Sequence, residues 1–196
     1  MAFPTVDIAE AQLFSNNPVL VTNSLSGYEQ RAVVSTQKFE LVARYSNLST
    51  LERRLIQSFI QEQQGALNSF DIALPGELGD SSAGFSGTIQ TAALGSVGES
   101  TVSISSSNST AVLKKGDLIR FTGKTKLYTV TADLTTDAGG TGTLSISPAL
   151  ITSVAGTTTI IHTGVSLNAR FKNTQNSWSV NQTQYANLTL EFIEVF

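Results

Sequence analysis

Residues 114–150 read KKGDLIRFTGKTKLYTVTADLTTDAGGTGTLSISPAL, a stretch in which short strand-like runs alternate with turn residues. Gly116-Asp117, Gly123-Lys124 and Asp137-Ala138-Gly139-Gly140 stand where the chain must turn, because Gly and Asp tolerate the backbone conformations of tight turns. The runs between these turns alternate apolar and polar side chains, as half-buried strands do. The stretch therefore predicts part of a small β module.

Runs of the same kind lie on both sides, so the Gly-, Ser- and Thr-rich texture covers residues 77–163. The strand-like runs are TIQTAA, STVSISS, DLIRFTG, KLYTVTADL, TLSIS and TTTIIHT. They follow one another at intervals of roughly 8–14 residues with turn signals between them, which is typical of an all-β barrel or sandwich.

A strand and a helix precede this region. Residues 38–45, KFELVARY, alternate strictly, which predicts a half-buried strand with one apolar face, made of Phe39, Leu41, Ala43 and Tyr45. Ser49 and Glu52 form a capping box that starts a helix, and Gly65 suits the left-handed residue after its end.

The helix over residues 50–64 is predicted to be amphipathic. Its expected buried face comprises Leu51, Leu55, Ile56, Phe59 and Ile60. Its expected solvated or interface face comprises Arg53, Arg54, Gln57, Gln61 and Glu62. The run FDIAL at 70–74 predicts a strand that ends at Pro75-Gly76.

The C-terminal region returns to firm alternation. Leu167, Ala169 and Phe171 share one face of a predicted strand, and Trp178 and Val180 suggest a short strand. A long final strand is expected to bury a row of apolar side chains, namely Ala186, Leu188, Leu190 and Phe192.

The two flanks of the Gly-rich region are each too small to stand by themselves, which predicts one interrupted domain. Residues 1–76 and 164–196 are expected to form a sheet with one helix, and residues 77–163 an inserted β barrel, since insertion at a surface loop is tolerated. Residues 1–35 are weakly patterned and predict an extended arm or edge strands. The fold class is mainly β (α+β): a β sandwich with one flanking helix and an inserted small barrel.

Composition excludes several classes of function. The 196 residues carry a net charge of -3 and only 14% charged side chains, so no basic surface for wrapping nucleic acid is expected. The local group of Lys114, Lys115, Lys124 and Lys126 is interpreted as solvated turn residues. With no cysteine, disulfides and thiolate metal sites are impossible. The sequence shows neither a signal peptide nor a membrane-spanning run, which predicts synthesis in a cytosol.

The residues that could take part in catalysis or ligand binding are interpreted as structural residues. His162, the sole histidine, is expected to face solvent near the end of a strand. Asp133 and Asp137 lack the ligand density of a calcium loop and are interpreted as turn-capping residues. Trp178 with Tyr185 could stack on a sugar or a base, but a core-facing role is preferred. We therefore expect no catalytic, cofactor-binding or metal-binding site, and a protein that is not an enzyme.

Three segments carry a resemblance to a known family. The segment YEQRAVVSTQKFELVARYSNLSTLERRLIQSFIQEQQGALNSFDIALPG resembles the N-terminal half of distal tail and related tail-tube-fold proteins of tailed bacteriophages. The stretch over residues 114–150 resembles an inserted β module of phage virion proteins, with its G-D-x-I-x-F, Y-x-V-T-A-D and T-L-x-I-S-P strands. The closing NSWSV and YANLTLEFIEVF are similar to the final strands of the tail domain.

The resemblance implies a structural virion protein with a tail-tube-like fold. It implies a homo-oligomeric ring, most often a hexamer, at the distal end of the tail or in the baseplate hub. Such a ring joins the tail-tube protein to the tip proteins and surrounds a channel through which DNA passes without specific binding. The chain would be made in the host bacterial cytoplasm, reside in the phage tail and have no membrane partner. A tail-tube or tail-completion protein of the same fold, or a module that binds a receptor or carbohydrate, remain alternatives.

Overall fold

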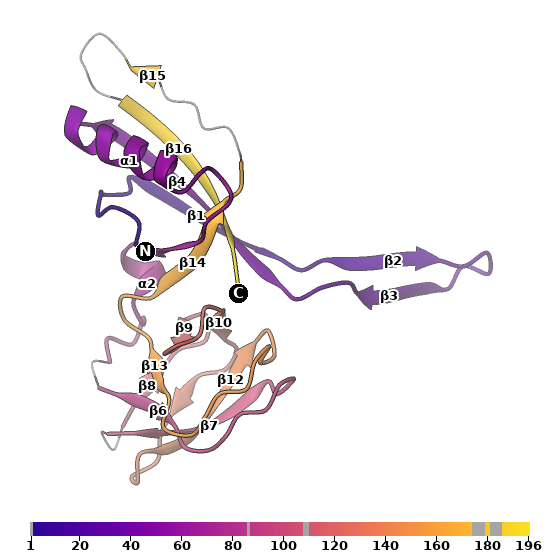
Figure 1. Ribbon diagram of the computed structural model, residues 1–196. Helices are drawn as coiled ribbons and strands as arrows, with labels where there is room; N and C mark the ends of the chain where they lie inside the picture. The colour runs from indigo at the N-terminus through magenta and orange to yellow at the C-terminus, as the bar shows by residue number, and fades with distance from the viewer. Residues whose placement is uncertain (1, 86, 108–109, 174–178, 181–185) are drawn as a thin grey trace.

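The computed structural model of the chain describes residues 2–85, 87–107, 110–173, 179–180 and 186–196. Figure 1 shows three parts: a sheet with a helix on one face, a barrel below the sheet, and a hairpin that projects away from both. The mainly β class with an inserted barrel is confirmed. A helix, rather than a second sheet, covers the main sheet.

The main sheet is antiparallel, in the order β1-β4-β16-β14-β5, and β15 pairs with β16. Its strands are β1 (Glu10–Asn16), β4 (Lys38–Leu48), β5 (Phe70–Ala73), β14 (Ser166–Phe171), β15 (Ser179–Val180) and β16 (Ala186–Glu194). The alternation predicted for residues 38–45 is confirmed, since Phe39, Leu41, Ala43 and Tyr45 are all buried. The apolar rows of β14 and β16 are buried too, from Leu167 to Phe171 and from Leu188 to Phe192.

Helix α1 (Thr50–Glu62) covers this sheet with Ile56, Phe59 and Ile60. The predicted capping box is present, because the Ser49 hydroxyl accepts from the Glu52 backbone N–H and the Glu52 carboxylate accepts from the Ser49 N–H. Gly65 has the expected positive φ of 67°. The helix therefore begins where local chemistry predicts, but it ends at Glu62, two residues before the predicted end, and Gln64 with a φ of 53° is left-handed ahead of Gly65.

The orientation of α1 about its axis differs from the prediction. Leu51 and Leu55 are 74% and 54% exposed, whereas Arg53 and Gln57 are half-buried. The buried stripe runs through Ile56, Phe59, Ile60 and Gln63, and at 3.6 residues per turn Arg53 lies nearer to its centre than Leu51. The prediction for Leu51 and Leu55 was wrong, because the helix packs through Phe59 on Phe3 and Phe70 in a rotation that leaves Leu51 and Leu55 in solvent.

The second body is a closed barrel of six short strands in the order β10-β12-β7-β6-β13-β9. These strands are β6 (Ile89–Thr91), β7 (Thr101–Ser106), β9 (Leu118–Phe121), β10 (Leu127–Val130), β12 (Thr141–Ser147) and β13 (Thr159–Ile161). Strands β8 (Val112–Leu113) and β11 (Leu134–Thr135) form a separate two-stranded pair. Each run predicted over residues 77–163 overlaps one of the six barrel strands.

Two neighbouring segments connect the barrel to the sheet. The short helix α2 (Gly76–Gly79) follows β5, and the return segment enters β14, the strand that pairs with β5. Between the segments the Ser81 N–H donates to the His162 carbonyl at 2.8 Å, and the Val165 N–H donates to the Gly79 carbonyl at 2.9 Å. The sheet therefore continues across the point where the barrel is inserted.

The hairpin consists of β2 (Val19–Asn23) and β3 (Glu29–Val33), and all ten of these residues are exposed. It extends sideways from the sheet, beyond the end of β1 (Figure 1). The first 35 residues thus supply both an edge strand, β1, and a projecting arm. None of the helices in the described part of the chain is long and apolar enough to cross a membrane.

Candidate assembly interface

His162 is buried, so the expectation of a solvent-facing side chain was wrong. Its Nε2 lies 3.0 Å from the Gly87 carbonyl oxygen, and its ring packs on Phe85 with centroids 5.5 Å apart. Its own carbonyl joins the two connecting segments through Ser81. Its Nδ1 is buried without a hydrogen-bond partner among the described residues, so the ring is enclosed and His162 packs the base of the barrel.

Asp133 and Asp137 cap turns, as predicted. Asp137 accepts hydrogen bonds from the Gly139 and Thr141 N–H groups and from the Thr141 hydroxyl, and these bonds hold its pKa below the usual value. Asp133 accepts from the Lys115 N–H and the Lys114 ammonium, which lower its pKa. Across the described residues, no three Asp, Glu or His side chains are grouped to hold a metal ion.

Lys126 is not a solvated turn residue, which corrects the interpretation of the four lysines. It is 1% exposed, and its ammonium lies 2.6 Å from the Glu194 carboxylate. The same ammonium donates to the backbone carbonyl and the side-chain oxygen of Gln37, both at 2.9 Å. Burial lowers the pKa of Lys126, against the opposing effect of the Glu194 charge. The turn-like sequence around Lys126 gave no sign of this partner, which is 68 positions away.

The Lys126–Glu194 pair joins three parts of the molecule. Glu194 is the last residue of β16, Lys126 directly precedes β10 of the barrel, and Gln37 directly precedes β4. Glu194 also accepts from the Leu127 N–H at 2.8 Å and the Phe39 N–H at 3.0 Å. A buried network whose members are all hydrogen-bonded favours one arrangement of the parts it joins. It therefore holds the barrel against the sheet beside the root of the hairpin.

Asp117 makes a second such link between the barrel and its connecting segment. It accepts from the Ser81 hydroxyl, from the Ser82 N–H and hydroxyl, and from the Lys114 N–H, at 2.7 to 3.1 Å. Burial acts to raise the pKa of Asp117, but these hydrogen bonds together lower it. The Gly116-Asp117 turn predicted from sequence is thus also an anchor.

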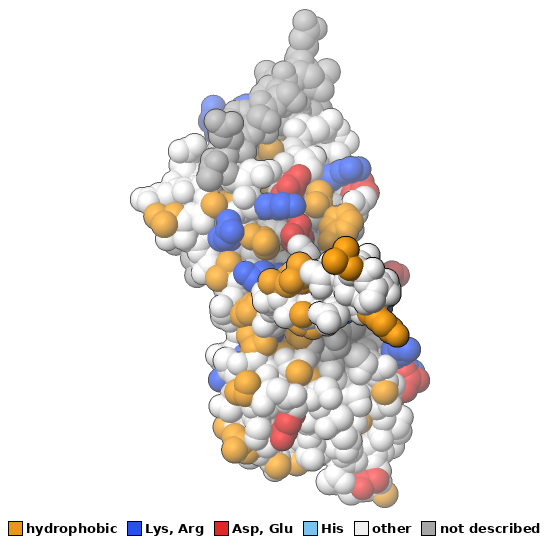
Figure 2. Space-filling view, turned by 90° about the vertical axis from the view of Figure 1, so that its right-hand side faces the viewer, with side chains coloured by type: hydrophobic (Ala, Val, Ile, Leu, Met, Phe, Trp, Pro, Cys, Tyr) orange, Lys and Arg blue, Asp and Glu red, His pale blue; other side chains and the backbone are white. Residues whose placement is uncertain are grey.

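The hairpin is the most exposed apolar element of the described chain. Its exposed apolar side chains are Val19, Leu20, Val21, Leu25, Tyr28 and Val33. Figure 2 looks onto the side from which the hairpin projects and shows apolar side chains gathered on it. Directly opposite residues in an antiparallel pair share a face, so Leu20, Thr22, Gln30 and Ala32 make one uncharged face. Strand β3 carries a salt bridge between Arg31 and Glu29 on the other face.

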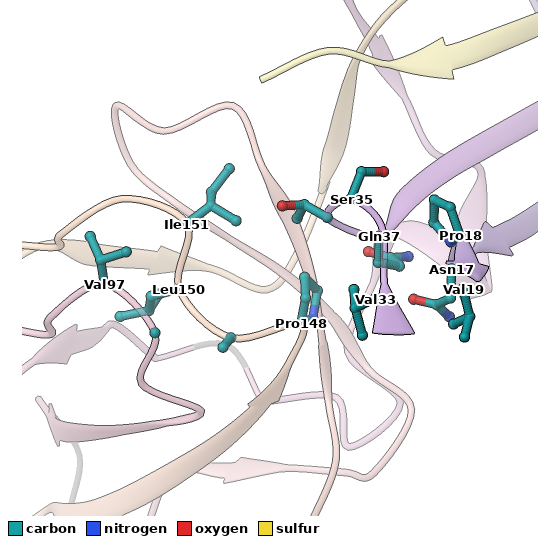
Figure 3. Close-up of a pocket in the computed structure, with 13 residues that line it drawn as sticks. Asn17, Pro18, Val19, Val33, Ser35, Gln37, Val97, Pro148, Leu150 and Ile151 are labelled. Carbon is teal, nitrogen blue, oxygen red and sulfur yellow. The ribbon is translucent and has the colours of Figure 1, made fainter. Parts of the chain in front are cut away.

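An apolar groove of about 440 Å³ lies where the hairpin root meets the barrel. Pro18, Val19 and Val33 line it from the hairpin side, and Val97, Pro148 and Ile151 line it from the barrel loops after β6 and β12 (Figure 3). Gln37, which bonds Lys126, belongs to the same lining.

The sequence analysis predicted the arm without identifying its surface. The available signal was the absence of charge from Ala11 to Tyr28, a run of 18 residues between Glu10 and Glu29. Interface cores are depleted of charged residues, so this run is typical of a surface that becomes covered. Trp178 and Tyr185, the other candidate contact residues, lie outside the described residues.

The barrel and the residues that flank it match a known protein family. Residues 84–165 match the family model described as distal tail protein pb9, B domain. A search of curated proteins gave no match to the chain. The resemblance to phage distal tail proteins is thus confirmed through the inserted module. Residues 84–165 of this chain are thus similar to the B domain of a phage distal tail protein, and this similarity indicates a structural role in the phage tail.

Proposed function

We propose that this chain is the subunit of a homo-oligomeric ring of six copies in the distal tail or baseplate hub of a tailed phage. The ring would join the tail tube to the tip proteins and enclose the channel for DNA. The observation that carries the proposal is the projecting β2–β3 hairpin, whose ten strand residues are all exposed. A two-stranded hairpin is at best marginally stable in water, so a neighbouring subunit is its expected support.

The edges of the main sheet support the same assembly. The N-terminal segment covers the outer side of β5, through a parallel bridge between Ala2 and Asp71 and a hydrogen bond from the Phe3 N–H to the Asp71 carbonyl. At the other end, β1 pairs only with β4 among the described strands. An unpaired strand edge invites pairing with another chain, so β1 is suited to extend the sheet into the next subunit.

The sheet domain and the barrel would have different roles in the ring. Residues 1–76 and 164–196 would form the ring and its channel, and residues 77–163 would form a peripheral barrel. The net charge of -3 suits a channel through which DNA slides, because clamping phosphates needs clustered Lys and Arg.

Electron cryomicroscopy of isolated tails with a tag in an exposed turn of the barrel tests the proposal. We expect one ring on the tail axis, at the junction of tube and tip. Density repeated along the whole tube would identify a tube protein instead, and density on side fibres or on the capsid would refute the ring.

A further inference from the structure

We infer that the groove at the root of each hairpin receives the tip of the hairpin of a neighbouring copy, with Leu25 and Tyr28 as the inserted side chains. This inference rests on the proposed ring and specifies the contact that closes it. It concerns a second copy of this chain, since tip and groove match each other chemically.

The tip presents apolar side chains on an ordered turn. Leu25 is fully exposed and Tyr28 is 75% exposed. The turn is held by the Ser24 N–H, which donates to the Tyr28 carbonyl at 2.9 Å, and by the Gly27 N–H, which donates to the Ser24 carbonyl at 2.9 Å. Gly27 has a φ of 82°, a conformation that favours glycine. Because the turn is preorganised, docking Leu25 costs little ordering of the backbone.

The groove is a composite of both bodies, and this gives it a specific shape. Val33 comes from the hairpin root, whereas Val97 and Ile151 come from barrel loops. The Lys126–Glu194 network fixes these two walls relative to each other through Gln37, which lies in the lining. A tip seated there would contact the sheet domain and the barrel at once.

Charge selects the occupant. All lining residues of the groove are uncharged, and so is the whole tip from Thr22 to Tyr28. A charged segment would lose its hydration in such a groove without finding a partner. The tip of a second copy avoids this cost and buries Leu25, which is otherwise in water.

The tip cannot reach the groove of its own chain. Five residue pairs separate it from the root, and at about 3.3 Å per residue the separation is roughly 17 Å of paired ribbon. Tip and groove are different surfaces, so the contact is heterologous, and copies joined in this way close into a ring when the rotation permits.

Cysteine cross-linking tests the contact, since the chain contains no cysteine. The double variant Leu25→Cys/Ile151→Cys is assembled into tails, oxidised and examined on a non-reducing gel. We expect a ladder of covalent oligomers that ends at the ring size. Each single variant should give no ladder, and the control pair Leu25→Cys/Leu67→Cys should give none either, because Leu67 is exposed but follows α1, away from the groove lining.

The outcomes separate the inference from the proposed function. Rings in the micrographs without the ladder would overturn the tip-in-groove contact and leave the ring standing. If the single variant Leu25→Cys gave covalent dimers and no larger species, the contact would be a symmetric one between two tips, and the inference would be overturned. Tails that contain no ring of this chain would overturn both. As a second readout, Leu25→Ser should reduce ring formation while the unfolding midpoint of the subunit stays unchanged.

Discussion

The barrel and the main sheet are both built of antiparallel strands, but only the barrel closes on itself. The six barrel strands close on themselves, so that β9 and β10 complete the ladder. The main sheet stays open, with β1 at one end and β5 at the other. Closure removes sheet edges, so the barrel has little need of a partner. The open sheet and its hairpin keep the surfaces on which assembly depends.

The cores of the two bodies also differ in the kind of side chain that fills them. The sheet core is rich in aromatic rings: Phe3, Phe39, Tyr45, Phe59, Phe70, Phe171 and Phe192. The barrel core is mostly branched aliphatic, with Phe121 and Tyr128 as its fully buried rings. The interior of a small barrel is just wide enough for packed side chains, whereas the layer between helix and sheet accommodates rings in edge contacts such as Phe59–Phe70, 4.9 Å between centroids.

The largest change that tests this comparison is deletion of the barrel from the sheet domain. Replacing residues 82–161 by a short Gly/Ser linker should leave a folded sheet with its helix, because Ser81 and His162 already lie side by side. Glu194→Gln should accompany the deletion, since Lys126 is lost. Circular dichroism should retain the helical signal and a cooperative transition. A remainder without cooperative unfolding would show that the sheet depends on the barrel.

The aromatic core is expected to be sensitive to truncation. Phe59→Ala should lower the free energy of unfolding by about 3–5 kcal/mol, through lost burial and a cavity among Phe3, Phe70 and Phe171. The matched control on the exposed side of α1 is Gln61→Ala, which should change the free energy of unfolding by less than about 0.5 kcal/mol. Equal losses in urea unfolding would contradict the assigned face.

The buried ion pair ties the two bodies together, and its loss should be of similar size. Lys126→Met leaves Glu194 buried without its cation, at a cost of about 3–5 kcal/mol. Lys126→Met/Glu194→Gln should recover part of this loss, because no buried charge remains and the amide oxygen can still accept from the Leu127 N–H. Lys114→Met, which breaks only the exposed pair with Asp133, should leave stability almost unchanged. A double variant as unstable as the single one would refute this account.

The anchor at Asp117 should show a pH dependence. Asp117→Asn should cost about 1–3 kcal/mol at neutral pH, since it weakens four hydrogen bonds to a carboxylate. The pKa of Asp117 is lowered from its usual value of 3.8, so its stabilisation is present above that pH and is lost as the pH falls through the lowered pKa. The gap between wild type and variant should therefore begin to narrow as the pH falls below about 4. A gap that is constant from pH 7 to pH 3 would rule out the titration of Asp117 as its cause.

The smallest effect is expected on the exposed side of α1. Leu55→Ser should change the free energy of unfolding by no more than about 0.5 kcal/mol, because the side chain already lies in water. Ile56→Ser, one position along, removes a fully buried side chain and serves as the contrast. If Leu55→Ser destabilised the isolated subunit as much as Ile56→Ser, the rotation of the helix would need revision.

Local chemistry made much of the fold predictable. The alternation of residues 38–45, the capping box at Ser49 and the turns at Gly116 and Gly123 depend on neighbours a few positions away. Such features are set by backbone preference and by the period of apolar side chains. The cap at Asp137 was predictable for the same reason, since its partners are Gly139 and Thr141.

The candidate interface was much less predictable. Lys126 looked exposed because it follows the Gly123-Lys124 turn, and His162 because it stands near the end of a strand, yet each is buried by segments far along the chain. The uncharged run from Ala11 to Tyr28 indicated a surface to be covered, but gave neither the length of the arm nor its direction. The groove could not be predicted, because its walls are 50 or more positions apart in sequence.

The sequence by itself determined where strands, turns and the helix lie and which strand faces are apolar, since these follow from short-range sterics and periodicity. Only the tertiary structure decided which edges close and which stay open. It also decided that Lys126 meets Glu194, and that Val33 and Ile151 face each other across one groove. The physical reason is that strand pairing and burial join residues distant in the chain, whose relative positions no local preference specifies.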